Sequence, residues 1–175
     1  MVHFGLVNEN ILLRQAAADD LEAINDIYNH YVLHSTCTYQ EEPETIEARQ
    51  QWFDDHRPEQ HPAIVAVLNG KIVGWGSVSA YHSRCAYRHT AEISIYVQHE
   101  HHRRGIGSAI LDDLMARARN IGYHAVIAAI DGDQKASITM HIRFGFIEVG
   151  HFQQVGFKFG RWLDVIYLER ILQTP

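Results

Sequence analysis

Two kinds of hydrophobic periodicity alternate along the chain. In four segments the apolar residues recur every three to four positions, as on one face of an amphipathic helix, and shorter apolar runs between them are typical of strands. Helices are expected at residues 17–32, 45–56, 107–122 and 135–145. Strands are expected at residues 11–16, 63–68, 71–81, 90–98, 124–130, 146–152 and 162–172. The order of these segments predicts an α/β fold in which helices flank a mixed central sheet.

Residues at the ends of several segments support these boundaries. Thr45 is a residue type that caps helix N-termini, and Gly122 is suited to end the helix that precedes it. The dipeptide Asn69-Gly70 favours a tight turn, so the strands on either side of it are expected to form a hairpin. Strict alternation in residues 90–98 divides that strand into two faces: Ile93, Ile95 and Val97 on one, and Glu92, Ser94 and Tyr96 on the other.

Composition narrows the class of protein. A chain of 175 residues without repeats or linkers predicts a single domain over residues 1–175, with a core of about 11–172. The net charge of −6 disfavours a general role in nucleic-acid binding, and no apolar run approaches the ~20 residues of a membrane span. The two cysteines, Cys37 and Cys85, form no disulfide framework and fit the reducing cytoplasm. We therefore expect a cytoplasmic protein without nucleic-acid or membrane partners.

The stretch HHRRGIGS at residues 101–108, between a strand and a helix, admits several interpretations. His99, His101 and His102 offer metal-binding side chains, but no CxxC or HExxH spacing accompanies them, so no metal is expected. A dinucleotide loop needs a third glycine where Ile110 stands, and a Walker loop needs Gly-Lys-Ser/Thr, which is absent. Two interpretations of this stretch remain: a solvated basic loop, or a backbone cradle for phosphate.

The cradle interpretation has a physical basis in the same residues. Gly105 and Gly107 allow close approach of a ligand, and the helix that begins near Ser108 presents unpaired amides and the positive end of its dipole. Arg103 and Arg104 would add positive charge at the rim.

The order of motifs in the second half of the chain resembles the GNAT superfamily of acyl-CoA N-acyltransferases. These motifs are the strand ISIYV, the loop HHRRGIG, a helix, a further strand and the segment DGDQKASITMHIRFGF. In that superfamily a loop of the form Gln/Arg-x-x-Gly-x-Gly/Ala binds the pyrophosphate of acetyl-CoA, and His102 here stands where Gln or Arg is usual. The segments IYNHYVLHSTCTYQEEPET, AYRHTAEISIYV and QVGFKFGRWLDV resemble the phosphinothricin and methionine sulfoximine acetyltransferase branch. The resemblance implies acetyl-CoA as co-substrate, bound by Ile95, Tyr96, Val97, His102, Arg103, Arg104, Gly105, Ile106, Gly107, Ser108, Gln134 and Ser137.

Two residues are expected to carry the chemistry. The acceptor amine is protonated near neutral pH and must lose a proton before it attacks the thioester. The branch has a glutamate base at the position of Glu92, and in a dry cleft the pKa of this carboxyl should be raised. Where many members carry a tyrosine that protonates the leaving thiolate, the branch has histidine, here His141, which can give a proton to sulfur or take one from the amine. Gln134 replaces a common Asn or Asp.

The residues expected to bind the acceptor are Tyr39, His82, Arg84, Tyr87 and Arg88, with Lys158, Arg161 and Trp162 as outer candidates. Branch members often carry Trp-Arg-Pro where this chain has Tyr81-His82-Ser83, which leaves the exact acceptor open, and Arg84, two positions later, is a candidate to substitute for that arginine.

The sequence therefore predicts an N-acetyltransferase for the α-amine of a small amino acid or analogue, such as methionine sulfoximine, methionine sulfone or phosphinothricin. A polyamine or protein N-terminus as acceptor, and a non-catalytic acetyl-CoA-binding module, remain as alternatives. Members of the branch usually form dimers, which implies a homodimer.

Overall fold

The computed structural model describes residues 11–172. Its seven strands form one mixed sheet in the order β1-β2-β3-β4-β5-β7-β6. The strands are β1 (Leu12–Gln15), β2 (Ala63–Leu68), β3 (Lys71–Ala80), β4 (Thr90–Val97), β5 (Ala125–Asp131), β6 (Ile147–Lys158) and β7 (Arg161–Ile171). The α-helices are α1 (Leu21–His34), α2 (Ile46–Asp54), α3 (Ile106–Ile121) and α4 (Lys135–Arg143). Between residues 11 and 172 no helix is both long and apolar enough to cross a membrane.

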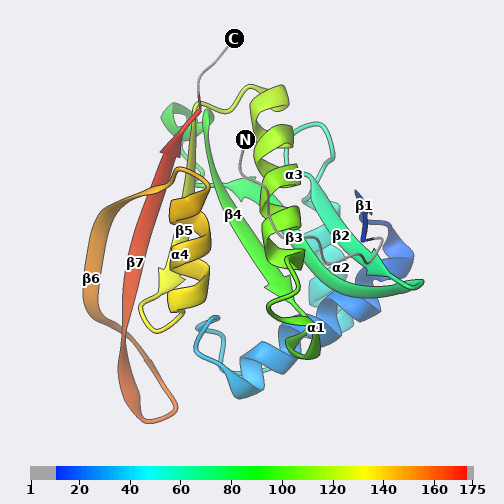
Figure 1. Cartoon of the computed structure of the whole chain (residues 1–175), viewed down its shortest axis with the longest axis horizontal. Coiled ribbons are helices and arrows are strands. Elements are labelled where there is room, and N and C mark those ends of the chain that lie inside the picture. The colour runs from blue at the N-terminus through cyan, green and yellow to red at the C-terminus, as the bar shows by residue number, and fades with distance from the viewer. Residues whose placement is uncertain (1–10, 173–175) are drawn as a thin grey trace.

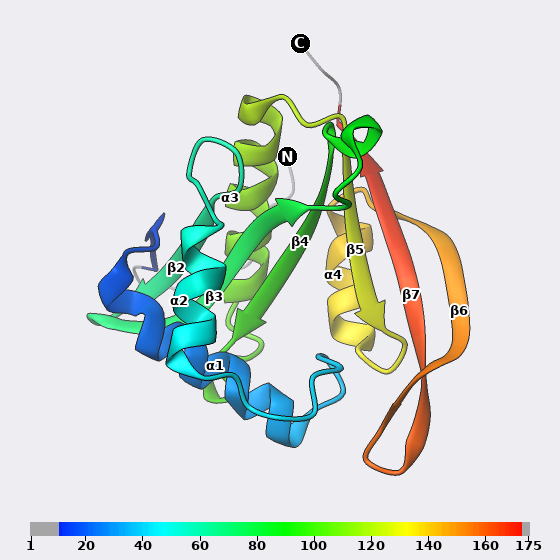
Figure 2. The same cartoon turned by 180° about the vertical axis from the view of Figure 1, so that it is seen from behind.

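The helices cover both faces of the sheet. Helices α3 and α4 lie on one face, and α1 and α2 on the other, as the two opposite views show (Figures 1 and 2). The larger core lies beneath α3 and includes Ile110, Leu114 and Val126. A smaller core joins α1 to Val65 and Trp75 on the opposite face. The expected mixed sheet with flanking helices is therefore confirmed.

Local sequence signals were reliable for several element ends. The Thr45 side chain accepts a hydrogen bond from the Ala48 amide at 3.2 Å and caps α2. Asn69 and Gly70 have φ of 50° and 77° in the tight turn between β2 and β3, and Gly122 ends α3 with φ of 96°. These positions were predicted because each depends on neighbouring residues alone.

Two element boundaries differ from the prediction by more than two residues. The helix expected from residue 17 begins as α1 at Leu21, after a 3₁₀ turn over Ala18–Asp20. The Asp20 carboxylate accepts hydrogen bonds from the Arg14 guanidinium at 2.6 and 2.8 Å and from the Ala17 amide at 2.8 Å, which fixes this turn.

The strand expected at 146–152 continues to Lys158 as β6. Its pairing with β7 passes through two irregularities, between Glu148 and Gly150 and between Phe152 and Gly156, which disrupt the alternating pattern. The hairpin then turns at Phe159-Gly160, with φ of 50° and 75°, a dipeptide without the usual Asn-Gly signal.

Helix α3 packs closely on β3 at Gly76. A Cβ atom at this residue would lie 2.7 Å from Ile110 Cγ2 and 2.9 Å from the Ser94 carbonyl oxygen, so an alanine must push the helix or strand aside. We expect Gly76→Ala to cost about 1–3 kcal/mol of unfolding free energy, measured by urea denaturation. The control is Gly150→Ala, whose Cβ would make only ordinary contacts at 3.7 Å or more. Equal stability of the two variants would contradict this account of the packing.

Candidate active site

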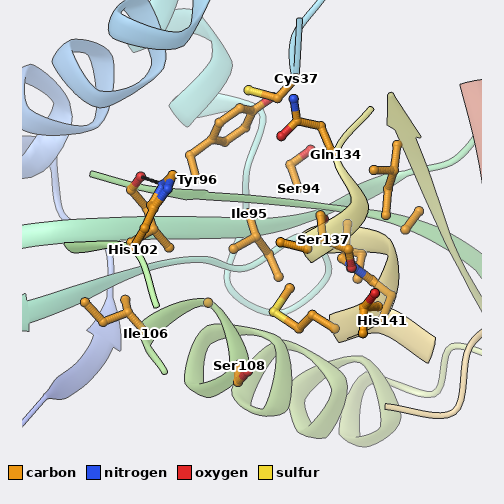
Figure 3. Close-up of a pocket in the computed structure, with 18 of the residues that line it drawn as sticks. Cys37, Ser94, Ile95, Tyr96, His102, Ile106, Ser108, Gln134, Ser137 and His141 are labelled. Atoms are coloured by element: carbon orange, nitrogen blue, oxygen red, sulfur yellow. Dashed lines mark hydrogen bonds between the residues drawn. The ribbon is translucent and has the colours of Figure 1, made fainter. Parts of the chain in front are cut away.

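The candidate site lies where the two parallel strands at the centre of the sheet separate. β4 and β5 pair only from Thr90 to Glu92 and from Ala125 to Ile127, although both strands continue further. A pocket of about 750 Å³ opens in the gap, lined by β4, the glycine loop, β5 and α4. Figure 3 shows side chains from these elements around it, with His141 and Ser137 on α4 and Ser108 at the start of α3. A slot between diverging strands exposes backbone groups of β4 to a ligand.

Glu92 lies in this pocket, on the face of β4 that the alternation predicted. Desolvation by the surrounding protein raises the pKa of its carboxyl group above the usual glutamate value. Among residues 11–172 no group donates a hydrogen bond to the carboxylate, so burial acts without compensation. A half-buried carboxylate of this kind is suited to accept a proton near neutral pH.

His141 is buried in α4 and lines the same pocket. Its Nδ1 lies 2.8 Å from the Ser137 carbonyl oxygen, and its ring meets the edge of Phe146 at 5.2 Å. Because a carbonyl only accepts, Nδ1 carries the hydrogen, and the neutral ring keeps its lone pair on Nε2. Burial lowers the pKa of His141, which favours this neutral form.

The glycine loop has the geometry of an anion cradle. Gly105 precedes α3 with φ of 80°, and the Ala109 amide makes the first helical hydrogen bond back to its carbonyl, at 3.0 Å. The amides of the first helical turn are therefore available to a ligand. Arg103, with φ of 62°, also adopts the left-handed conformation. A Cβ at Gly107 would lie 3.3 Å from Met140 Sδ and 3.7 Å from Val97 Cγ2, so the glycine keeps the space between α3, α4 and β4 open.

His102 lines the pocket, but its side chain also anchors the loop. Its Nε2 lies 2.6 Å from the Tyr31 hydroxyl and 3.1 Å from the Val97 carbonyl oxygen, and its ring stacks parallel to that of Tyr31. Tyr31 donates a hydrogen bond to the same carbonyl group. These contacts tie the start of the glycine loop to α1, so His102 supports the backbone that would hold phosphate.

Two of the three histidines considered as metal ligands make aromatic contacts with α1. His99 stacks on His30 with ring centroids 4.3 Å apart, and His102 contacts Tyr31, which packs against the same His30. Over the described part of the chain no three His, Cys, Asp or Glu side chains come together in a way that could hold a metal ion.

Thirteen of the predicted catalytic and cofactor residues line this one pocket, and Arg104 is not among its lining residues. The thirteen are Glu92, Ile95, Tyr96, Val97, His102, Arg103, Gly105, Ile106, Gly107, Ser108, Gln134, Ser137 and His141. Figure 3 shows Gln134 beside Cys37 at one end of the pocket. Cys37 has no sequence signal, because it reaches the pocket from the segment between α1 and α2.

The predicted acceptor residues lie outside this pocket. His82, Arg84, Tyr87 and Arg88 are exposed on the segment between β3 and β4, where Tyr81 and His82 both pack against Tyr87. This segment adjoins the Glu92 end of β4, and the glycine loop follows the opposite end (Figure 1). A molecule that contacts it therefore approaches Glu92 from the side opposite to the phosphate cradle.

Tyr39 and Lys158 hold the α1–α2 segment against the β6–β7 hairpin. Tyr39 donates a hydrogen bond to the Asp164 carbonyl at 3.0 Å. Buried Lys158 donates to the carbonyls of Ser35 and Thr38 at 2.9 and 2.8 Å, and so fixes the segment that carries Cys37. The outer candidates Arg161 and Trp162 are exposed on β7, where Arg161 pairs with Asp133 at 2.6 Å.

Removal of the Lys158 ammonium group should loosen the wall of the pocket. Lys158→Met leaves the two carbonyl groups without their donor, so we expect a loss of about 1–3 kcal/mol in unfolding free energy and a higher KM for the acceptor. Thermal and urea denaturation, with steady-state kinetics, would measure both effects. Lys71→Met, at an exposed position, is the control. Indistinguishable behaviour of the two variants would remove the proposed role of Lys158.

Comparison with known proteins identifies relatives of this chain. The model of the acetyltransferase (GNAT) family matches residues 24–146. The L-amino acid N-acyltransferase MnaT of Escherichia coli is 34% identical over 157 residues, covering 90% of this chain and 91% of the relative. The L-methionine sulfoximine/L-methionine sulfone acetyltransferase of Pseudomonas aeruginosa is 37% identical over 158 residues, covering 90% and 92%.

A solved structure gives the same result in three dimensions. The GNAT phosphinothricin acetyltransferase of Sinorhizobium meliloti, in complex with acetyl-CoA, superposes with a TM-score of 0.90 at 37% identity, covering 93% of this chain and 88% of that one. Sequence and fold therefore agree: the chain belongs to the GNAT family of acetyltransferases.

Proposed function

We propose that this protein transfers the acetyl group of acetyl-CoA to the α-amine of a small amino acid or analogue, with methionine sulfoximine, methionine sulfone and phosphinothricin as acceptors. The observation that carries the proposal is a desolvated carboxylate, Glu92, in one pocket with a glycine-loop cradle. The relatives named for amino-acid N-acylation and for the methionine analogues support this class of acceptor. The two cysteines are unpaired, in keeping with a cytoplasmic location.

The cradle fits the pyrophosphate of acetyl-CoA. Amides at the start of α3 donate to the phosphate oxygens, and Arg103 and Arg104 add charge at the rim. The edge of β4 around Tyr96 and Val97, exposed where β5 diverges, pairs with the pantetheine amides as one strand pairs with another. This arrangement directs the thioester toward Glu92.

Glu92 removes a proton from the acceptor ammonium, directly or through one water. The freed lone pair attacks the thioester carbonyl, so a C–N bond forms and the C–S bond breaks. Because His141 is held neutral with its lone pair on Nε2, we assign it the second proton from the nitrogen, which it passes to the CoA sulfur. The first proton, held by Glu92, is released to solvent as the one net proton per turnover.

The acceptor approaches Glu92 from the β3–β4 segment. Arg84 and Arg88 on this segment are suited to bind the acceptor carboxylate, since a guanidinium offers two parallel donors. In this proposal Tyr39 and Lys158 shape the opposite wall through the α1–α2 segment and make no contact with the acceptor.

A panel of amines tests the proposal. Release of free CoA thiol from acetyl-CoA would be followed with methionine sulfoximine, methionine sulfone, phosphinothricin, ordinary amino acids, spermidine and a short peptide. We expect turnover only with the amino acids and their analogues. Turnover confined to spermidine or peptide would overturn the acceptor class, and acetyl-CoA binding without turnover on any amine would favour the non-catalytic alternative.

We propose further that two copies of the chain associate through the β6–β7 hairpin. Edge strand β6 and its partner expose large apolar side chains, among them Val155, Phe157, Phe159 and Trp162. An exposed apolar edge strand favours association, and a symmetric second copy offers the same apolar surface in return. Sedimentation should give twice the mass of one chain, and Trp162→Asp should yield monomers. A monomeric wild-type protein would contradict this proposal.

A further inference from the structure

A row of cross-strand pairs leads from the pocket toward α2. In the antiparallel pairing of β3 with β4, directly opposed residues share one face of the sheet. The pairs on the Glu92 face are Trp75 with Tyr96, Ser77 with Ser94, and Ser79 with Glu92. Stacking of the Trp75 and Tyr96 rings at 4.8 Å follows from this register. Ser79 therefore lies directly opposite the proposed base on the same face of the sheet, and its hydroxyl group makes no hydrogen bond with Glu92.

The hydrogen of that hydroxyl group is engaged by His56, which follows α2. His56 Nδ1 lies 2.6 Å from the Trp52 carbonyl oxygen, and its Nε2 lies 2.9 Å from Ser79 Oγ. Because a carbonyl only accepts, Nδ1 carries the ring hydrogen, and Nε2 of the neutral ring accepts. Ser79 consequently donates to His56 and can offer only lone pairs to its other neighbours.

The direction of the Ser79–His56 hydrogen bond affects the basicity of Glu92. A carboxylate that accepts hydrogen bonds is stabilised in its charged form and becomes a weaker base, whereas a carboxyl group facing only acceptors keeps its proton affinity. No residue in the described part of the chain donates to Glu92, and the opposed hydroxyl group directs its hydrogen to His56. His56 thus holds the hydroxyl group of the residue opposite Glu92 as a donor to its own ring, and not to the carboxylate.

We propose that His56 and Ser79 are positioning residues that keep Glu92 strongly basic, by orienting the Ser79 hydroxyl hydrogen away from the carboxylate. The inference rests on the proposed role of Glu92 as the base. It adds two residues to the acetyl-transfer site that neither contact the cradle nor belong to the pocket lining.

Protonation of His56 would reverse the chain of hydrogen bonds. Nε2–H would then donate to Ser79 Oγ, and the Ser79 hydroxyl group would no longer be engaged as a donor to His56 and could rotate toward Glu92. The ionisable groups around His56 are His61, Asp55 and Arg49, and desolvation lowers the pKa of His56, which favours the neutral ring. The ionisable group that interacts with Glu92 is Tyr167, which in turn interacts with Tyr81.

The test compares pH profiles of kcat/KM for the acceptor in four full-length enzymes: wild type, His56→Phe, Ser79→Ala and the double variant. Phenylalanine keeps the ring on Trp52 but removes the acceptor, so Ser79 becomes free to donate to Glu92. We expect His56→Phe to move the acid limb to lower pH by about one unit and to lower the plateau several-fold. The double variant lacks the hydroxyl group and should show no such shift, like Ser79→Ala. Titration of the acceptor amine itself is common to all four profiles.

The outcomes separate this inference from the proposed function. An unmoved limb in His56→Phe, or the same downward shift in the double variant, would overturn the inference. If Glu92→Gln retains the acid limb, the base assignment fails instead. Thermal unfolding identifies loss of fold, and His56→Leu, which also removes both ring nitrogens, replaces the phenylalanine variant if that one does not fold.

Discussion

Replacement of Glu92 by glutamine should lower kcat by about 10²- to 10⁴-fold, the usual effect of removing a general base, while the affinity for acetyl-CoA stays unchanged. Glutamine keeps the size of the side chain and its place on β4 but cannot take a proton from the acceptor. Stopped-time assays of CoA thiol release, together with calorimetric titration of acetyl-CoA, would measure the two quantities. Glu22→Gln, at an exposed position in the first turn of α1, is the matched control.

The role of Glu92 as the base also predicts how the activity depends on pH. Burial raises the pKa of the Glu92 carboxyl, and only the ionised form accepts a proton. Activity should therefore fall as the pH decreases through this raised value, and the limb should vanish in Glu92→Gln. Turnover by the variant within about threefold of wild type would remove Glu92 from the mechanism.

The free energy of unfolding should depend on pH in the opposite direction to the activity. A carboxyl group with a raised pKa in the folded state holds its proton more tightly there than in the unfolded chain. The stability that it contributes at low pH is therefore lost as the pH rises from the ordinary glutamate pKa through the folded-state value. At pH 8 the Glu92→Gln variant should unfold at the same temperature as wild type or higher. A lost activity together with an intact or raised melting temperature would separate catalysis from folding.

The sequence could predict features that depend on interactions between residues close together in the chain. The cap at Thr45 and the turn at Asn69-Gly70 depend on neighbouring residues and were predicted correctly. The far half of β6 was missed because its two irregularities break the alternation and Phe159-Gly160 lacks a turn signal.

The candidate site divides in the same way. Strand alternation placed Glu92 on one face of its strand, and family resemblance assigned catalysis to His141 and cofactor binding to the glycine loop. One pocket is lined by all three. The Tyr31–His102 contact joins residues 71 apart, and His56–Ser79 joins residues 23 apart. Such contacts are set by how α1 and α2 dock on the sheet, and no periodicity in a single segment reveals them.

Enlargement of Gly107 should separate the two interpretations of the glycine loop, a phosphate cradle or a turn that merely needs flexible residues. In Gly107→Val the new side chain would enter the space bounded by Met140 and Val97, where a Cβ already lies within 3.3 and 3.7 Å of them. We expect acetyl-CoA to bind about tenfold more weakly or worse, equivalent to about 1.4 kcal/mol or more, as measured by calorimetric titration.

The control lies at the other end of the same helix. Gly122 has φ of 96°, and a Cβ there would meet nothing within 4 Å, so Gly122→Ala introduces backbone strain without filling any space. It should lower the unfolding free energy by about 1–2 kcal/mol and leave acetyl-CoA affinity unchanged, because the first turn of α3 keeps its amides. Gly107 has no positive φ, so valine there adds no such strain, and its effect should fall on binding. If Gly107→Val binds acetyl-CoA as tightly as wild type, the loop does not hold the cofactor through the space that this glycine leaves open.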